Sequence, residues 1–120
     1  MTINSVIESI DRLKPNGYTD ADKYGWISAV DGILSVEVLG ESQPVSYRCP
    51  EDGDRELILP APFDDLYGLY LGAMIDFYNQ EYTHYNNSAM LFAQRLDEYK
   101  RWYLRQHGEG KAKNFRNVMG

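Results

Sequence analysis

The 120-residue chain has a single cysteine, Cys49, and no long apolar run. One cysteine excludes an internal disulfide, which agrees with a reducing, cytoplasmic setting. No apolar stretch approaches the roughly 18 residues that a membrane-spanning helix needs, and no basic segment precedes an apolar run. We therefore expect neither a membrane span nor a secretory leader. A composition of 43% apolar and 25% charged residues is typical of one globular domain.

Motifs for catalysis or cofactor binding are missing as well. The sequence has no glycine-rich phosphate loop, no G-x-S-x-G and no H-E-x-x-H, and the acids at 51–56 lack the spacing of an EF-hand calcium loop. Cys49 could pair with a histidine as a nucleophile, but no supporting motif surrounds it. His84 has one other candidate ligand nearby, Glu81, whereas a zinc site needs three or four ligands. His84 and His107 are the two histidines of the chain, and neither belongs to a complete set of ligands or catalytic groups. We expect no enzymatic activity, no cofactor and no metal.

Three acids, Asp64, Asp65 and Asp76, fall on or near one face of a predicted helix. Paired carboxylates can act as acid and base. Asp64 and Asp65, however, stand in the first turn, where the helix dipole favours acidic side chains. Helix capping is the preferred interpretation.

Charge is distributed unevenly along the chain. Residues 1–99 contain 6 of the 12 Lys and Arg and 17 of the 18 Asp and Glu, a balance of −11. Residues 100–120 contain the other 6 basic residues and one acid, Glu109, a balance of +5. A general nucleic-acid binder would be basic overall. An acidic body with a basic end instead favours protein partners of complementary charge.

The first 40 residues predict two helices. Apolar residues recur at helical spacing from Ile3 to Leu13, before Pro15 and Gly17 end the helix; they are Ile3, Val6, Ile7, Ile10 and Leu13. Thr19 and Asp22 resemble a capping box that opens a second helix, from about Asp20 to Leu39. Its apolar stripe is Trp26, Ile27, Val30 and Leu34. Its β-branched end could be extended instead.

Residues 41–62 contain four prolines and no helical pattern. Leu57, Ile58 and Leu59 predict a short extended piece that ends at Pro60. A loop of about 20 residues is long for a compact domain and often belongs to an interaction.

Two further helices follow. The third begins at Pro62 or Asp64 and is apolar around most of its circumference, so neighbours should surround it, another subunit among them. Its main stripe is Leu66, Leu69, Tyr70, Ala73, Met74 and Phe77. The register slips near Glu81, and because Asn tolerates the left-handed conformation that ends helices, a tight turn is expected at Asn79.

The fourth helix is predicted over 82–107, before Gly108 and Gly110. Its inward stripe is Tyr85, Ala89, Phe92, Leu96, Tyr99 and Tyr103. The aromatic stretch from Asp76 to Tyr103 is therefore chiefly a packing seam between antiparallel helices. The fold class expected is all-α: a small helical bundle built around a long antiparallel helical hairpin, with two N-terminal helices and a Pro-rich connecting loop. Residues 1–108 form one domain and 109–120 a flexible basic tail.

Candidate interface residues lie at the end of the fourth helix and in the tail. Leu91 and Trp102 fall beside each other, off the main stripe, where they form an exposed apolar flank or pack on the first two helices. The basic, aromatic segment 99–107 suggests either a nucleic-acid contact or the cations usual at a helix C-terminus, which is preferred. The candidate set is Leu91, Trp102, Arg105, Lys111, Lys113 and Arg116.

Residues 57–107 resemble small head-to-tail connector (adaptor) proteins of tailed phages and prophages. The resemblance rests on the segment LPAPFDDLY at 59–67, a tight turn, and a returning helix with YNNS at 85–88 that ends in aromatics near an Arg and a His. Residues 6–32, VIESIDRLKPNGYTDADKYGWISAVDG, also look like this class. One departure is Gln80, where a glycine is expected in the turn.

The resemblance implies an all-helical structural protein without catalytic residues. Members of the class form a ring beneath the portal, join the capsid vertex to the tail and leave a channel for DNA. The expected partners are the portal protein, tail-side head-completion proteins and other copies of the chain, with DNA nearby in the channel. The expected location is the virion head–tail junction, after synthesis in the bacterial host cytoplasm. The alternative is a helical-hairpin protein-interaction module of regulatory or unknown role.

Overall fold

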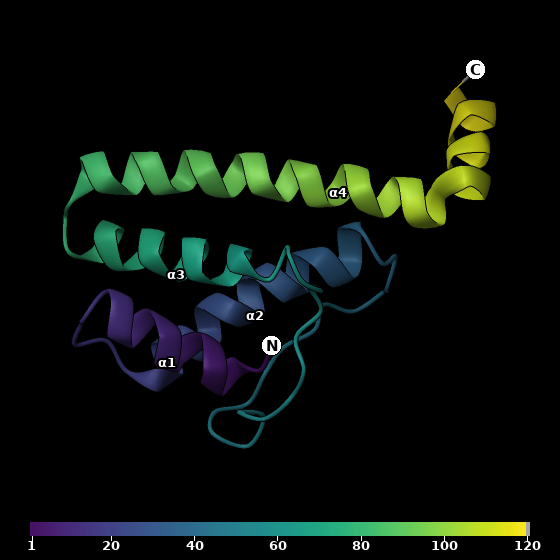
Figure 1. The fold of residues 1–120 in the computed structure, drawn as a ribbon. Helices are drawn as coiled ribbons and strands as arrows, with labels where there is room; N and C mark the ends of the chain where they lie inside the picture. Colours follow the sequence, from purple (N-terminus) through teal and green to yellow (C-terminus); the bar gives the residue numbers. More distant parts are fainter. Residues whose placement is uncertain (120) are drawn as a thin grey trace.

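The computed structural model describes residues 1–119, and side chains are described for residues 1–107. Over residues 1–119 the chain forms four helices and no strand, which confirms the predicted all-α class. The helices are α1 (Ile3–Leu13), α2 (Asp20–Glu37), α3 (Asp65–Tyr78) and α4 (Tyr82–Met119). Helix α3 contacts the other three. Figure 1 shows α4 on one side of α3, running in the opposite direction, and α1 and α2 on the other side.

Helix α1 has the predicted core face. Four of the five periodic residues are buried: Ile3, Val6, Ile7 and Ile10. The fifth, Leu13, is 74% exposed, contrary to its place in the stripe. The reason is that the helix ends there and Lys14 leaves helical geometry with φ −141°. At the other end, Thr2 and Ser5 form a capping box that satisfies backbone donors of the first turn.

Helix α2 begins at the predicted capping box. The Thr19 side chain accepts from the Asp22 backbone, and the Asp22 side chain accepts from Thr19. The ambiguous end of the segment is helical as far as Glu37, two residues short of the predicted end. The Leu34 carbonyl then accepts hydrogen bonds from the N–H groups of both Val38 and Leu39.

The long connection between α2 and α3 contributes to the core instead of standing free. Four of its apolar side chains are buried: Tyr47, Leu57, Leu59 and Phe63. The extended piece predicted near Leu57 forms no strand, only an isolated bridge between Thr2 and Glu56. Backbone hydrogen bonds of 2.9 Å from Asn4 to Gly53 and 3.0 Å from Leu57 to Met1 attach the loop to the start of α1.

Helix α3 is buried beyond its predicted main stripe, as expected for a helix that neighbours surround. Its buried residues are Leu66, Tyr67, Leu71, Gly72, Ala73, Ile75 and Asp76, whereas the predicted stripe member Phe77 is 41% exposed. The helix lies between α4 and the α1–α2 pair, so burial follows the neighbours on both sides and not one stripe. The first acids stand where they were predicted, Asp64 at the N-cap and Asp65 in the first turn. Asp64 makes no capping hydrogen bond with its side chain, and Asp65 instead pairs with Arg95 of α4 at 3.1 Å.

Helix α4 places its predicted inward stripe against α3. Tyr99 is 2% exposed, and the other five stripe residues are partly buried. Rings join the two helices, with centroids 5.2 Å apart for both Tyr70–Phe92 and Phe77–Tyr85. The helical assignment continues past the predicted end at His107 to Met119. The predicted tail, residues 109–120, lies outside the part of the chain whose side chains are described.

The turn between α3 and α4 is tight and closes by two backbone hydrogen bonds. Gln80 N–H donates to Phe77 at 3.0 Å, and Glu81 N–H donates to the Asp76 carbonyl at 2.9 Å. This is the pattern of a Schellman motif, whose C′ residue takes the left-handed conformation. That residue is Gln80, with φ +64°, while Asn79 stays helical. The left-handed residue of the turn is thus Gln80, at the position where the sequence departs from the expected glycine.

Candidate functional site

Helix α2 carries an exposed apolar stripe in addition to its buried one. The buried inner stripe is Ile27, Val30, Asp31 and Leu34. The outer stripe, Trp26, Ala29, Ile33 and Val36, repeats at steps of three and four residues, so its members share one line along the helix. Ile33 is 51% and Val36 41% exposed. Few helices that face only water have such a line.

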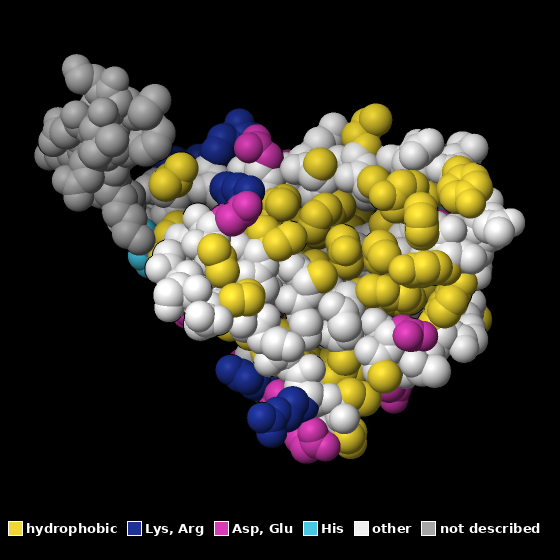
Figure 2. Space-filling model, turned by 180° about the vertical axis from the view of Figure 1, so that it is seen from behind, with side chains coloured by type: hydrophobic (Ala, Val, Ile, Leu, Met, Phe, Trp, Pro, Cys, Tyr) yellow, Lys and Arg dark blue, Asp and Glu magenta, His cyan; other side chains and the backbone are white. Residues whose placement is uncertain are grey.

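The outer stripe borders a groove. Its open volume is about 490 Å³, and its lining includes Ala29, Ile33 and Val36 of α2 and Pro44 and Val45 of the following loop. Ala29 and Ile33 also line a smaller hollow whose far wall is formed by rings and side chains of α3 and α4. Figure 2 shows this rear face of the molecule, where apolar side chains form a broad area with few charges. We call the outer stripe, together with Pro44 and Val45 of the loop, the apolar face.

The apolar face ends in aromatic rings near the α3–α4 turn. Trp26 stacks on Tyr78 with centroids 5.9 Å apart, and Tyr18 meets Trp26 edge-on at 5.7 Å. The Tyr18 hydroxyl donates to Asn79 Oδ1 at 2.6 Å, which ties this edge to the turn. Tyr78 and Tyr82 are 54% and 55% exposed. Exposed rings of this kind are enriched among residues that dominate protein–protein binding energy.

The buried Asp31, on the inner stripe of α2, attaches the long loop to the helices. Its carboxylate, 0% exposed, accepts hydrogen bonds from the hydroxyls of Tyr47 and Tyr67 and from the Ile58 N–H. The Tyr67 hydroxyl accepts in turn from the Leu59 N–H at 2.9 Å. One carboxylate thus connects α2, α3 and both ends of the long loop.

Burial sets the ionisation of this group. Desolvation raises the pKa of Asp31 above its ordinary value, and the hydrogen bonds from Tyr47 and Tyr67 act in the opposite direction. Burial and the neighbouring carboxylate both raise the pKa of Tyr67. The hydroxyls therefore remain donors at neutral pH. Because both carboxylate oxygens and both hydroxyls have partners, we interpret the network as structural.

Three of the six predicted interface residues have described side chains. Leu91 is 53% exposed. Trp102 is partly buried and packs against Phe63 with centroids 5.3 Å apart, and Arg105 is exposed. The remaining three, Lys111, Lys113 and Arg116, lie outside the described side chains. Leu91 and Trp102 were expected to form an exposed flank or to pack on the first two helices. Of the two, Trp102 lies at the edge of the core.

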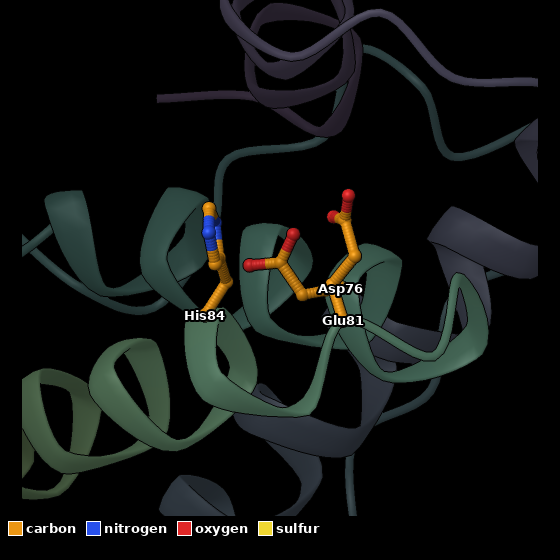
Figure 3. Close-up of side chains that lie close together, drawn as sticks. All are labelled: Asp76, Glu81 and His84. Carbon is orange, nitrogen blue, oxygen red and sulfur yellow. The ribbon is translucent and has the colours of Figure 1, made fainter.

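A second cluster lies at the α3–α4 turn, formed by Asp76, Glu81 and His84. One ligand-type atom from each residue lies within 4.8 Å of the others. Figure 3 shows the three side chains on the same side of the turn. The sequence indicated only the pair Glu81 and His84. Asp76 joins them because the Schellman turn folds the start of α4 back over the last turn of α3.

Asp76 is the buried member of this acid–histidine cluster. Its side chain is 0% exposed, and neither carboxylate oxygen accepts a hydrogen bond from the described residues. Its charged neighbour is the Lys14 ammonium, in ion-pair contact with Oδ1. The ammonium is therefore the compensation that the described residues give this carboxylate. A buried carboxylate in this state is costly unless a cation compensates it.

Asp31 was not singled out from the sequence, and Asp76 was named only together with Asp64 and Asp65, although a signal of burial exists for each buried acid. Asp31 is four residues after Ile27 and three before Leu34, so it lies on the inner stripe. Asp76 is four residues after Gly72 and three after Ala73, both buried in α3. An acid on an apolar stripe is the informative exception to hydrophobic patterning.

No protein-family model, curated protein sequence or solved structure matches this chain. Within the described residues, the search for membrane spans finds no helix with the length and apolarity to cross a bilayer.

Proposed function

We propose that this protein is a structural subunit of a phage or prophage head–tail connector ring, which joins the portal to the tail and leaves a channel for DNA. The support is of two kinds. The sequence resembles that class over residues 6–32 and 57–107, and the fold leaves the apolar face exposed. We also propose that the core of this subunit is the long antiparallel hairpin with its Pro-rich connection that the class is expected to have.

The apolar face carries the proposal. A monomeric protein gains nothing from the outer stripe, since Ile33 and Val36 remain about half exposed. Contiguous exposed apolar surface of this kind is typical of interfaces. The occupant we propose is a neighbouring copy of the chain. In a cyclic ring each subunit presents one surface to the next, so the contact can bury the stripe repeatedly.

Charge supports the same occupant. Acidic bodies carrying −11 repel one another, whereas the basic residues 100–120 carry +5 and attract a neighbouring body. The acidic balance also disfavours tight DNA binding, which suits a passage through which DNA must slide. We propose no catalytic role. The alternative, a helical protein-interaction module, would use the same face for an unrelated protein.

Assembly with a portal protein tests the proposal. The full chain would be mixed with the portal protein encoded beside it and analysed by native mass spectrometry and negative-stain microscopy. We expect a ring of several copies on the portal. Ile33→Asp should abolish or strongly reduce ring formation because it places a charge on the apolar face.

Leu13→Asp is the matched control. Leu13 is 74% exposed but belongs to α1 and not to the apolar face, so this variant should still assemble. A wild-type chain that never joins the portal would contradict the connector role, and capture of a different single partner would favour the interaction module.

A further inference from the structure

The acid–histidine cluster has the composition of a metal site. We propose that Asp76, Glu81 and His84 bind a divalent transition-metal ion of the zinc class. This site is independent of the proposed connector role, and neither the resemblance nor the apolar face implies it. An imidazole beside two carboxylates favours zinc, cobalt or nickel over magnesium or calcium, which prefer oxygen ligands alone.

The geometry is set by the backbone of the turn. The hydrogen bond of 2.9 Å from Glu81 N–H to the Asp76 carbonyl brings the ends of α3 and α4 together. Glu81 and His84 are three residues apart at the start of α4, so they face the same side. With all three ligand atoms within 4.8 Å of one another, rotations of the two exposed side chains are enough to enclose one ion.

The electrostatics of Asp76 provide an independent reason. Its buried carboxylate is in ion-pair contact with the Lys14 ammonium, and neither of its oxygens accepts a hydrogen bond from the described residues. The side chains of Glu81 and His84 make no hydrogen bond or ion pair within the described residues. Three ligand groups therefore converge with only one cation between them.

Lys14 is the competitor in this arrangement. Its side chain is 33% exposed, so the ammonium can move into water when a metal ion takes its place at Asp76. The ammonium thus compensates the carboxylate in the metal-free protein. Removing that ammonium should strengthen metal binding. At a site that does not include Asp76, the metal affinity would not change when Lys14 is replaced.

The experiment is a titration of the full chain, stripped with a chelator, with CoCl₂ by visible absorption and with ZnCl₂ by calorimetry. We expect one equivalent to bind and Tm to rise with excess zinc, because an ion that binds only the folded state stabilises it. His84→Ala should lower affinity by more than about 10–100-fold, the loss typical for even an outer hydrogen-bond partner of a ligand. Lys14→Met should bind more tightly than wild type.

His107→Ala is the control, since it removes the other histidine, which is exposed and stacks on Tyr103. It should bind as wild type does. The proposal is overturned if one equivalent fails to bind at millimolar metal, or if His84→Ala and His107→Ala lose affinity equally. Weaker binding by a folded Lys14→Met would overturn the competition at Asp76. Circular dichroism of each variant confirms its folding. If Lys14→Met does not fold, the titrations of wild type and His84→Ala still test the metal site.

Discussion

At the scale of single residues, Asp31 decides how the long loop attaches to the helices. Three donors from the loop and α3 converge on this carboxylate, so one side chain replaces the backbone pairing that a strand would have supplied. Partly satisfied networks of this kind are costly, and fully satisfied ones specify a unique arrangement. The network therefore fixes the path of a loop that has no regular structure.

Tyr67→Phe tests this role by removing one hydroxyl and little volume. The Leu59 N–H loses its acceptor and Asp31 loses a donor. Because unsatisfied buried groups cost about 1–3 kcal/mol, the free energy of unfolding should fall by about that amount. Urea unfolding at neutral pH measures it. Tyr82→Phe, at a site 55% exposed, should stay within about 0.5 kcal/mol of wild type; equal effects from both variants would contradict the network.

The pH dependence of stability should reveal Asp31 as well. Burial raises its pKa above the ordinary 3.8, so over the interval between the two values the folded state holds a proton that the unfolded state has released. Its stabilising contribution is complete below the ordinary pKa and is lost as pH rises through the raised value. Asp31→Asn cannot titrate. The difference in unfolding free energy, wild type minus variant, should therefore decrease as pH rises from about 4; parallel curves would refute this.

At the scale of elements, the α3–α4 turn contains a residue ill suited to its conformation. Gln80 has φ +64°, where a side chain is unfavourable and glycine is usual. Gln80→Gly should raise the free energy of unfolding by about 1 kcal/mol. Asn79→Gly is the control, since Asn79 has φ −80° and glycine there should not stabilise. Thermal unfolding of both variants decides, and a destabilised Gln80→Gly would be inconsistent with the turn described.

Helix α2 has two apolar sides, and isoleucines on each side provide a matched comparison. Ile27 is 0% and Ile33 51% exposed. Ile27→Ala should lower the free energy of unfolding by about 2–5 kcal/mol because it leaves a cavity. Ile33→Ala should change it by only about 0.5 kcal/mol, as is usual at exposed sites. Denaturant unfolding of the isolated chain measures both, and comparable losses would mean that the outer stripe is already covered.

At the scale of the whole molecule, the described core is complete without the last residues. Every buried apolar residue of the core lies between Ile3 and Tyr99, while residues 100–120 carry a balance of +5. Two of its six basic residues already pair within the chain, Lys100 with Glu37 and Arg101 with Asp97. We propose that the others contact a neighbouring molecule, and such a contact should weaken as salt screens it.

Deletion of residues 109–120 separates folding from assembly. Tm of the isolated chain should remain nearly unchanged, because the core formed by the described side chains, from Ile3 to Tyr99, stays in the truncated chain. Assembly on the portal should decline, most clearly at low salt, where attraction between basic ends and acidic bodies is strongest. Native mass spectrometry at two salt concentrations provides the measurement. If the truncated chain assembles as well as the full chain in both, the end is passive.

Local patterns predicted the helices well because their causes are local. The Thr19–Asp22 capping box, the α1 face and the inward side of α4 depend on residues within a few positions of one another. Leu13 and Phe77 were wrongly placed on buried stripes, because burial there depends on where a helix stops and on which neighbours flank it. The acid–histidine cluster was found in part, since Glu81 and His84 are close in sequence but Asp76 meets them only across a turn.

The sequence by itself determined that the chain is all-α, where its helices begin, and that its charge is divided between an acidic body and a basic end. These properties follow from spacing, capping and composition. Only the tertiary structure decided that Asp31 anchors the loop, that Asp76 joins Glu81 and His84, and that the outer stripe of α2 is left uncovered. Each of these depends on which segments meet in space, and periodicity within one segment carries no information about that.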